Sequence, residues 1–251
     1  MALTFSTLAL GTRQDAGQFK SKCESDLSGT SQSHVAESEP SVDEIKAFFA
    51  TSPEWVYLAG HFRPSFNAFV GDAESYVNVL HNERNNNNTD ATIKIEFLAD
   101  RVKVNRAGTK FELVKGTDFK LHENIKGVFW GGCNVHSVAS TWTAITSLFG
   151  ADIVSVGWSG TTGWTIPHIT MGGTVPGADG HPTPAQDFFE RLVAAGSRTS
   201  VNIKESWLQA AAPINWTSGG TNFADHFNVR YFESSQLKEW GIQNSAVVEI
   251  P

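Results

Sequence analysis

Two short apolar segments of the sequence each end at glycine and are followed at once by a side chain that can do acid–base or nucleophilic chemistry. Residues 54–62 read EWVYLAGHF and include His61, and residues 125–133 read IKGVFWGGC and end at Cys133. Cysteine catalysis requires a thiolate nucleophile and an imidazole that moves the proton. The two segments therefore make His61 and Cys133 the first candidates for a catalytic pair.

The elements around these residues predict how the two side chains could meet. Residues 55–59 and 127–130 are apolar enough for buried strands, and strands alternate with helices along the chain. This pattern favours a three-layer α/β sandwich with a mostly parallel central sheet. In such sheets ligands bind beyond the carboxyl ends of the strands. If the two strands are neighbours, His61 and Cys133 lie within reach of each other at one edge of the sheet.

Helix-capping residues, turns and changes in composition divide the rest of the chain into predicted elements. Ser41 and Glu44 have the spacing of a capping box at a helix start, and Gly150 is placed to end a helix. The polar, Ser-rich residues 11–40 are predicted to form a surface loop with the composition of a disordered segment. Residues 92–115 are predicted to form a small antiparallel β insertion. The predicted strands are 3–10, 55–59, 92–98, 101–105, 110–114, 127–130, 152–157, 228–232 and 246–250. One predicted helix begins after Ser41, and three others cover 139–149, 183–195 and 200–211.

Bulk properties narrow the class of protein. The length of 251 residues fits one domain, 1–251, and the net charge of -7 with scattered Lys and Arg argues against nucleic-acid binding. No apolar run approaches the ~18–20 residues of a membrane helix, so no membrane association is expected. The two cysteines, Cys23 and Cys133, are expected to be free thiols. The amino terminus is a poor secretory signal, so a cytoplasmic location is expected, with leaderless export as the alternative.

In the order and spacing of these segments, the chain resembles the caspase-like cysteine peptidases, which include caspases, gingipains, separases and the bacterial CHAT-type proteases. These proteins carry a His after one strand, usually within hydrophobic-x-G-H-G, and a Cys after the next main strand. The matching segments are YLAGHF at 57–62 and VFWGGCN at 128–134. The bacterial branch continues with a helix, a glycine turn, a strand and two more helices, matched here by TAITSLFGADIVSVGWSG, DFFERLVAAG and SVNIKESWLQAAA. The resemblance covers roughly residues 41–212.

This resemblance implies a role for each matched residue. Cys133 would be the nucleophile and His61 the general base or acid, while the backbone N–H groups of Phe62 and Cys133 would form the oxyanion hole. Trp158 and Ser159 fall where the family lines its substrate cleft. The expected substrate is a protein or peptide, a partner protein or activator is a further expectation, and neither a cofactor nor a metal is implied.

The chain also departs from the family pattern at the proposed site. Phe62 replaces the usual Gly, and Gly131 and Gly132 stand where an acidic residue usually precedes the Cys. No acidic pocket residue marks a preference for Lys or Arg at the cleavage site. Two alternatives therefore remain open: a non-catalytic caspase-like module that binds a partner protein, and another Cys-dependent hydrolase such as an amidase.

Three other motifs compete with this interpretation. The GWSGT segment at 157–161 lacks the final glycine of a serine-hydrolase nucleophile elbow. Cys133 and His136 have a C-x-x-H spacing, but a zinc site needs further ligands, and His136 is instead the main rival of His61 as proton partner. The Gly-rich residues 172–180 lack the phosphate-binding pattern of a P-loop.

Overall fold

The computed structural model describes the chain in separate stretches that include most of its sheets. They are residues 3–10, 30–36, 40–59, 61–63, 68–72, 92–131, 135–137, 139–159, 191, 204–208, 217–218, 221–222, 227–233, 236–243 and 246–250. For some strand residues, His61 among them, the description is limited to the backbone. The predicted loop residues 172–180 and the predicted helix at 183–195, apart from residue 191, lie outside the described residues.

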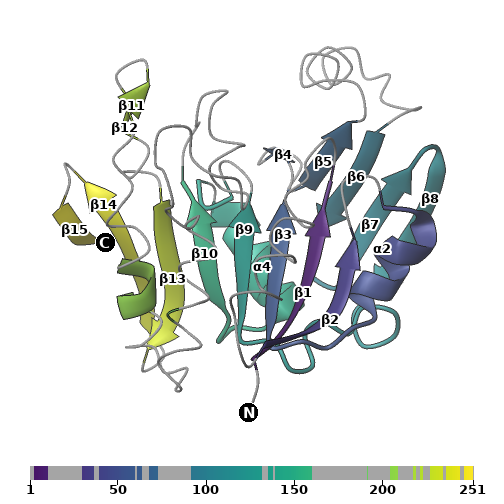
Figure 1. Ribbon diagram of the computed structural model, residues 1–251, viewed down its shortest axis with the longest axis horizontal. Helices are drawn as coiled ribbons and strands as arrows, with labels where there is room; N and C mark the ends of the chain where they lie inside the picture. Colours follow the sequence, from purple (N-terminus) through teal and green to yellow (C-terminus); the bar gives the residue numbers. More distant parts are fainter. Residues whose placement is uncertain are drawn as a thin grey trace.

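The described strands form one large sheet in the order β15-β14-β13-β10-β9-β3-β1-β2 (Figure 1). Five neighbouring strands of this sheet are parallel to one another: β2, β1, β3, β9 and β10. The other three strands pair antiparallel: β13 with β10, β14 with β13, and β15 with β14. The strands are β1 (Leu3–Ala9), β2 (Thr30–Ala36), β3 (Trp55–Ala59), β9 (Gly127–Gly131), β10 (Val154–Trp158), β13 (Phe227–Glu233), β14 (Gln236–Gln243) and β15 (Ala246–Ile250). The predicted α/β class is confirmed, and the large sheet is mixed, with a parallel half that contains β3 and β9 and an antiparallel half at the carboxyl end of the chain. The three-layer arrangement stays a prediction.

A second, antiparallel sheet has the strand order β4-β5-β6-β7-β8. Its strands are β4 (His61–Arg63), β5 (Ala68–Asp72), β6 (Thr92–Phe97), β7 (Arg101–Arg106) and β8 (Thr109–Val114). The antiparallel strands predicted within 92–115 are confirmed, but the sheet is larger than predicted because β4 and β5 join it. The chain passes from β3 of the large sheet to β4 of this sheet with one residue between them. A further pair, β11 (Thr217–Ser218) and β12 (Thr221–Asn222), forms a short ribbon.

The predicted loop at 11–40 requires a correction, because residues 30–36 form strand β2, which pairs in parallel with β1. The remaining residues of that prediction, 11–29 and 37–39, lie outside the described residues. The sequence of β2, TSQSHVA, is largely polar. An outermost strand needs only its backbone to pair with one neighbour and is often polar. Polarity therefore misled the prediction at the edge of the sheet.

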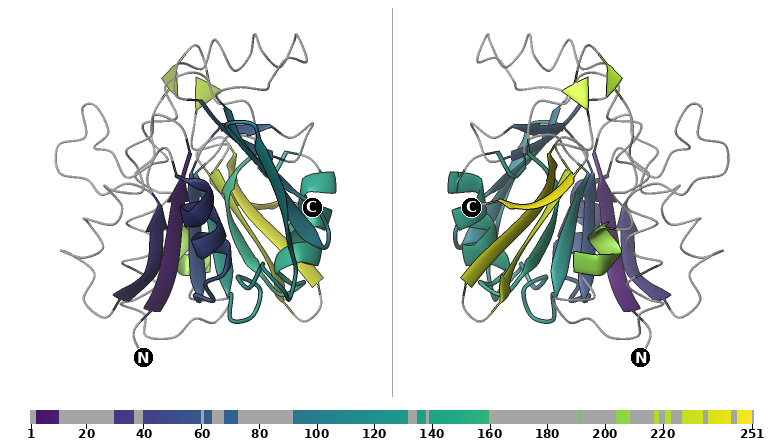
Figure 2. Two further views of the ribbon diagram at one scale, coloured as in Figure 1. Left: turned by 90° about the vertical axis from the view of Figure 1, so that its right-hand side faces the viewer. Right: turned by 90° about the vertical axis from the view of Figure 1, so that its left-hand side faces the viewer.

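One hydrophobic core joins the two sheets and two helices. Leu58 and Trp130 of the large sheet belong to the same buried cluster as Ile95 and Phe97 of the second sheet. The second sheet, α2 (Val42–Phe49) and α4 (Ala139–Phe149) thus cover one face of the large sheet, as Figure 2 shows from the side. The helices contribute to the same cluster Ile45, Phe48, Phe49, Ile145, Leu148 and Phe149.

The helix boundaries agree with their predicted signals. Ser41 and Glu44 form the capping box, since Glu44 N–H donates to Ser41 Oγ (3.2 Å) and Ser41 N–H donates to Glu44 Oε2 (2.7 Å). Helix α4 ends before Gly150, which has a φ of 125°. A side chain at that φ would be strained, so glycine is favoured there. Residues 204–208, within the predicted helix at 200–211, are helical. No helix in the described part of the chain has the length and apolar character needed to span a bilayer.

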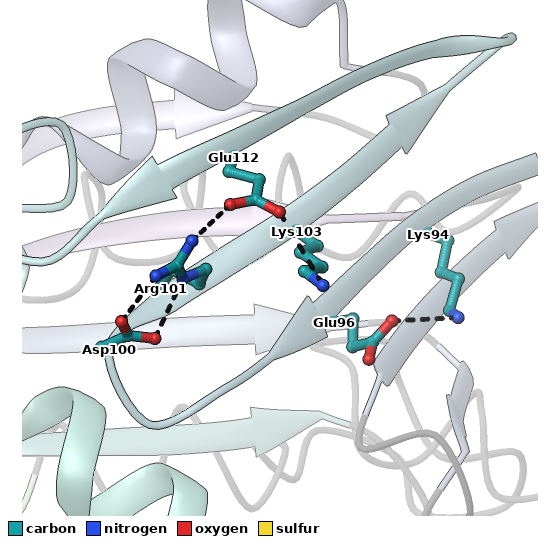
Figure 3. A network of polar contacts seen from close by, with 6 residues as sticks. All are labelled: Lys94, Glu96, Asp100, Arg101, Lys103 and Glu112. Atoms are coloured by element: carbon teal, nitrogen blue, oxygen red, sulfur yellow. Dashed lines mark hydrogen bonds and ion pairs between the residues drawn. The ribbon is translucent and has the colours of Figure 1, made fainter.

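The second sheet alternates between a buried apolar face and a charged outer face, as expected for a half-buried antiparallel sheet. On β6, for example, Ile93, Ile95 and Phe97 are buried, whereas Lys94 and Glu96 between them are partly exposed and 3.2 Å apart. Figure 3 shows this outer face, where Arg101 contacts Glu112 at 2.7 Å. Its other ion pairs join Arg101 to Asp100 and Lys103 to Glu112. The hydrogen bond from Arg101 lowers the pKa of Asp100.

Candidate functional site

The two strands that precede the predicted catalytic pair are direct neighbours. Strands β3 and β9 are parallel, and their last residues, Ala59 and Gly131, are paired in register. The chain therefore leaves both strands at the same edge of the large sheet, two residues before His61 and two before Cys133. Adjacent strands lie about 4.8 Å apart. The neighbouring strands that the dyad requires are thus present in the described sheet.

The reacting atoms of the predicted pair are not among the described atoms. His61 is the first residue of β4, and its backbone pairs with Val70. Its side chain is not described. Cys133 lies entirely outside them. The dyad, and the backbone donor at Cys133, therefore remain predictions.

Phe62, predicted to supply an oxyanion-hole N–H, lies in the middle of β4 opposite Phe69. Its side chain is 3% exposed and belongs to the main hydrophobic cluster. Position 62, where the resemblance implies Gly, therefore has room for a large side chain, because β4 turns that position toward the core. The role of the Phe62 N–H stays a prediction.

Trp158 and Ser159, the predicted cleft residues, lie at the end of β10, the strand next to β9. The Trp158 side chain is fully buried, and Ser159 is partly exposed. The carbonyl oxygen of Trp158 accepts a hydrogen bond from the backbone N–H of His136 (3.0 Å). Trp158 thus packs within the protein beside the segment that follows Cys133, and its predicted contact with substrate stays a prediction.

His136, three residues after Cys133, is buried, and both of its ring nitrogens are hydrogen-bonded. Nδ1 lies 2.6 Å from Asn228 Oδ1, and Nε2 lies 2.7 Å from Ser155 Oγ. An amide oxygen can only accept, so Nδ1 carries the proton and donates to Asn228. Nε2 is then an acceptor for the hydroxyl of Ser155, and Ser155 Oγ in turn accepts from Trp130 Nε1–H (2.8 Å). The hydrogen bonds fix one tautomer of the neutral imidazole.

The surroundings of His136 keep its ring uncharged. Burial lowers the pKa of His136 to about 3, the positive charge of Arg230 acts in the same direction, and the hydrogen bond with Asn228 opposes both. The side chain is 2% exposed, and Gly157 of β10 lies beside the ring. Because it is buried and both of its ring nitrogens are hydrogen-bonded, His136 is poorly suited to take a proton from Cys133 or to bind zinc.

The hydrogen bonds continue from His136 into the antiparallel half of the large sheet. Asn228 Nδ2–H donates to Glu239 Oε1 (2.7 Å), and Glu239 Oε2 lies 2.7 Å from Arg230 Nε in an ion pair. Arg230 Nη2–H donates to the backbone carbonyl oxygen of His136 (2.7 Å), so the chain of contacts returns to His136. We call this set the His136 network; its members are Trp130, His136, Ser155, Asn228, Arg230 and Glu239.

Sequence reasoning identified only His136 in this network. Ser155 could have been recognised from the sequence, because it is a lone hydroxyl within the otherwise apolar strand VSVGW. In the structure its side chain is 0% exposed. A buried hydroxyl requires a hydrogen-bond partner. Asn228, Arg230 and Glu239 gave no comparable signal, because their contact with His136 depends on the pairing of β10 with β13 and of β13 with β14.

The structure describes parts of two competing motifs, the GWSGT segment and the possible zinc site. In the GWSGT segment, Gly157 and Trp158 belong to β10 and Ser159 follows it, while residues 160 and 161 lie outside the described residues. Within the described stretches, no three His, Cys, Asp or Glu side chains are grouped as metal ligands.

Comparisons of the chain with protein-family models, curated proteins and solved structures found no match.

Proposed function

We propose that this chain is a cysteine endopeptidase with a caspase-like arrangement, in which Cys133 is the nucleophile and His61 moves the proton. The observation that carries the proposal is the in-register, parallel pairing of β3 and β9. Reactive side chains that follow neighbouring strands at the same edge would meet in the part of an α/β sheet where ligands bind. No cofactor enters the proposed reaction.

Two further observations support this proposal. The elements after Cys133 are α4, Gly150 and β10, in the order that the caspase-like resemblance implies. In addition, the ring of His136, the main rival proton partner, is buried and hydrogen-bonded at both nitrogens. His61 is then the better partner for Cys133.

The proposed reaction follows the general scheme of cysteine peptidases. His61 takes the proton of the Cys133 thiol, and the thiolate adds to the carbonyl carbon of a peptide bond. The N–H groups of Phe62 and Cys133 would stabilise the oxyanion, each by about 2.7–4 kcal/mol. The C–N bond then breaks as His61 protonates the leaving amine. Water, with His61 as base, hydrolyses the thioester and restores the thiol.

Peptide cleavage by matched variants tests the proposal. We expect the protein to cleave members of a diverse peptide mixture, Cys133→Ala to abolish cleavage, and His61→Ala to slow it by about 10²–10⁴-fold. Cys23→Ala is the control, because it removes the other thiol and should leave the rate unchanged. Cleavage by folded Cys133→Ala at the original rate would contradict the proposal.

One observation favours a second candidate, a non-catalytic module that binds a partner protein through the same edge. Phe62 lies in β4 with its side chain in the core, so the backbone at that position belongs to a sheet rather than to a glycine turn. Absence of peptide cleavage, together with Cys133 alkylating no faster than Cys23, would support this module. Hydrolysis of small amides but not of peptides would instead indicate an amidase.

A further inference from the structure

The segment that contains Cys133 starts and ends at positions fixed by the surrounding structure. At its start, Gly131 is buried and paired in register with Ala59. At its end, Val135 is 0% exposed and belongs to the main hydrophobic cluster. His136, the next residue, forms hydrogen bonds through its backbone N–H, its backbone carbonyl and both ring nitrogens. Three residues, 132–134, join these two anchors.

The hydrogen bonds at His136 come from strands far away in the sequence. Ser155 and the carbonyl of Trp158 belong to β10, Asn228 and Arg230 to β13, and Glu239 orients both β13 side chains from β14. The side-chain hydrogen bonds run in one direction, from Trp130 through Ser155, His136 and Asn228 to the carboxylate of Glu239. A buried polar network contributes little net stability compared with apolar packing, but it can select one arrangement.

We infer that the His136 network is a positioning device for Cys133: it holds the end of the segment that carries the nucleophile, so that the thiol is presented to its proton partner and substrate. This inference rests on the proposed function, since it requires Cys133 to be the reactive thiol. His136 is a positioning residue and exchanges no proton with the substrate. The antiparallel strands β13 and β14 thereby control the reactivity of a residue that follows β9.

A charge swap between Asn228 and Glu239 tests this inference. Asn228→Asp alone places two carboxylates at a contact that is now 2.7 Å, and Glu239→Gln alone removes the carboxylate that pairs with Arg230. In the double variant, the carboxylate introduced at position 228 can accept from His136 Nδ1–H and from the amide introduced at position 239. The oxygen of that amide can still accept from Arg230. The double variant therefore keeps both the net charge and the chain of hydrogen bonds.

The measured quantity is the rate at which iodoacetamide alkylates Cys133, relative to Cys23 in the same molecule, in variants confirmed as folded by thermal denaturation. We expect each single variant to lower this ratio by roughly tenfold to a hundredfold, the loss that a displacement of about an ångström can cause at a reacting group. The pH midpoint of Cys133 alkylation should also rise toward the ~8.5 of a free thiol. The double variant should recover most of the rate and the midpoint.

Two further variants complete the design. Glu249→Gln is the matched control, because Glu249 forms an exposed ion pair with Lys238 between β14 and β15 (2.6 Å) and should leave the alkylation ratio unchanged. Ser155→Ala removes one hydrogen bond to His136 without changing any charge, and it should lower the ratio even if the single charge variants do not fold.

The possible outcomes separate this inference from the proposed function. If wild-type Cys133 is highly reactive but folded Glu239→Gln or Ser155→Ala alkylates at the wild-type rate, the positioning role is wrong and the peptidase proposal stands. Failure of the double variant to recover reactivity over a folded single variant would also contradict the positioning role. If wild-type Cys133 reacts no faster than Cys23, both proposals fail.

Discussion

The two histidines considered for the proton transfer occupy different positions in the fold. His61 begins β4 at the edge where β3 and β9 end, whereas His136 is enclosed by Ser155 and Asn228. A general base must be able to gain a proton near neutral pH. The pKa of His136, lowered to about 3 mainly by burial, makes it unsuitable for that task. At the residue scale, the structure thus separates a structural histidine from the candidate catalytic one.

The lowered pKa of His136 predicts a pH dependence of folding stability. Between the usual value of 6.5 and about 3, the unfolded chain binds a proton at this residue that the folded chain does not bind. Stability therefore falls as pH decreases through this window, by about 1.4 kcal/mol per pH unit from this one group. Well above pH 6.5 the ring is neutral in both states, and its titration has no effect.

The variant His136→Gln tests this contribution. It should be less stable than wild type at pH 7, because Gln cannot reproduce both ring hydrogen bonds. Its free energy of unfolding should nevertheless decline less steeply as the pH falls from about 6.5 to about 5, the upper part of that window. Urea denaturation at several pH values measures both quantities, and equal slopes for the two proteins would show that His136 is not held neutral by the fold.

At the scale of elements, the β7–β8 hairpin contains a strained turn. Arg106 and Thr109 are paired in register, so Ala107 and Gly108 form a two-residue turn with φ values of 48° and 81°. Turns with positive φ at both central positions favour Asn-Gly. A Cβ in the left-handed region costs roughly 1 kcal/mol, and Asn tolerates that region better than Ala does.

The variant Ala107→Asn should therefore stabilise the protein. We expect the free energy of unfolding to rise by about 0.5–1 kcal/mol, because Asn relieves strain at an exposed position without losing a contact. Gly108→Ala is the opposite control, since it introduces a Cβ at a φ of 81° and should destabilise the hairpin. Urea denaturation gives both values; an unchanged or lower stability of Ala107→Asn would contradict the turn geometry.

The elements that could be predicted from sequence are those whose signals are local. Buried strands such as β9 and β10 are largely apolar, and α2 has its capping box at Ser41. Strands β2 and β14 were missed because TSQSHVA is polar and QLKEWGIQ carries charges, whereas their pairing comes from neighbouring strands. Strand β4 is only three residues long, too short for a period to be recognised.

The candidate site likewise has features that local sequence patterns predict and features that they do not. The glycine-terminated runs before His61 and Cys133 are local, and they correctly predicted the two strands β3 and β9. That these strands are neighbours, which the dyad requires, is known only from the structure. The contact between His136 and Asn228 joins residues 92 positions apart, and no local pattern encodes it. Such a contact depends on strand order and register, which single-sequence patterns do not specify.

At the scale of the whole molecule, the strand order brings distant parts of the chain to one edge of the large sheet. Strand β3 leads into the second sheet, and β9 returns from it to lie beside β3. Strands β10 and β13 then extend the sheet on the other side of β9 (Figure 1). They carry Ser155, Asn228 and Arg230 of the His136 network. The edge at which His61 and Cys133 follow their strands is therefore assembled from both halves of the sequence.

The measurement that tests the central claim most directly is the distance between Cys133 Sγ and the nearer ring nitrogen of His61 in a crystal structure of the wild-type protein. The proposed dyad predicts a separation of about 3–6 Å, because a nucleophile and its base stand within or just beyond hydrogen-bond reach before substrate binds. The thiol should also be open to solvent. Side chains that point to opposite faces of the large sheet, or a Cys133 enclosed in the core, would contradict the peptidase proposal.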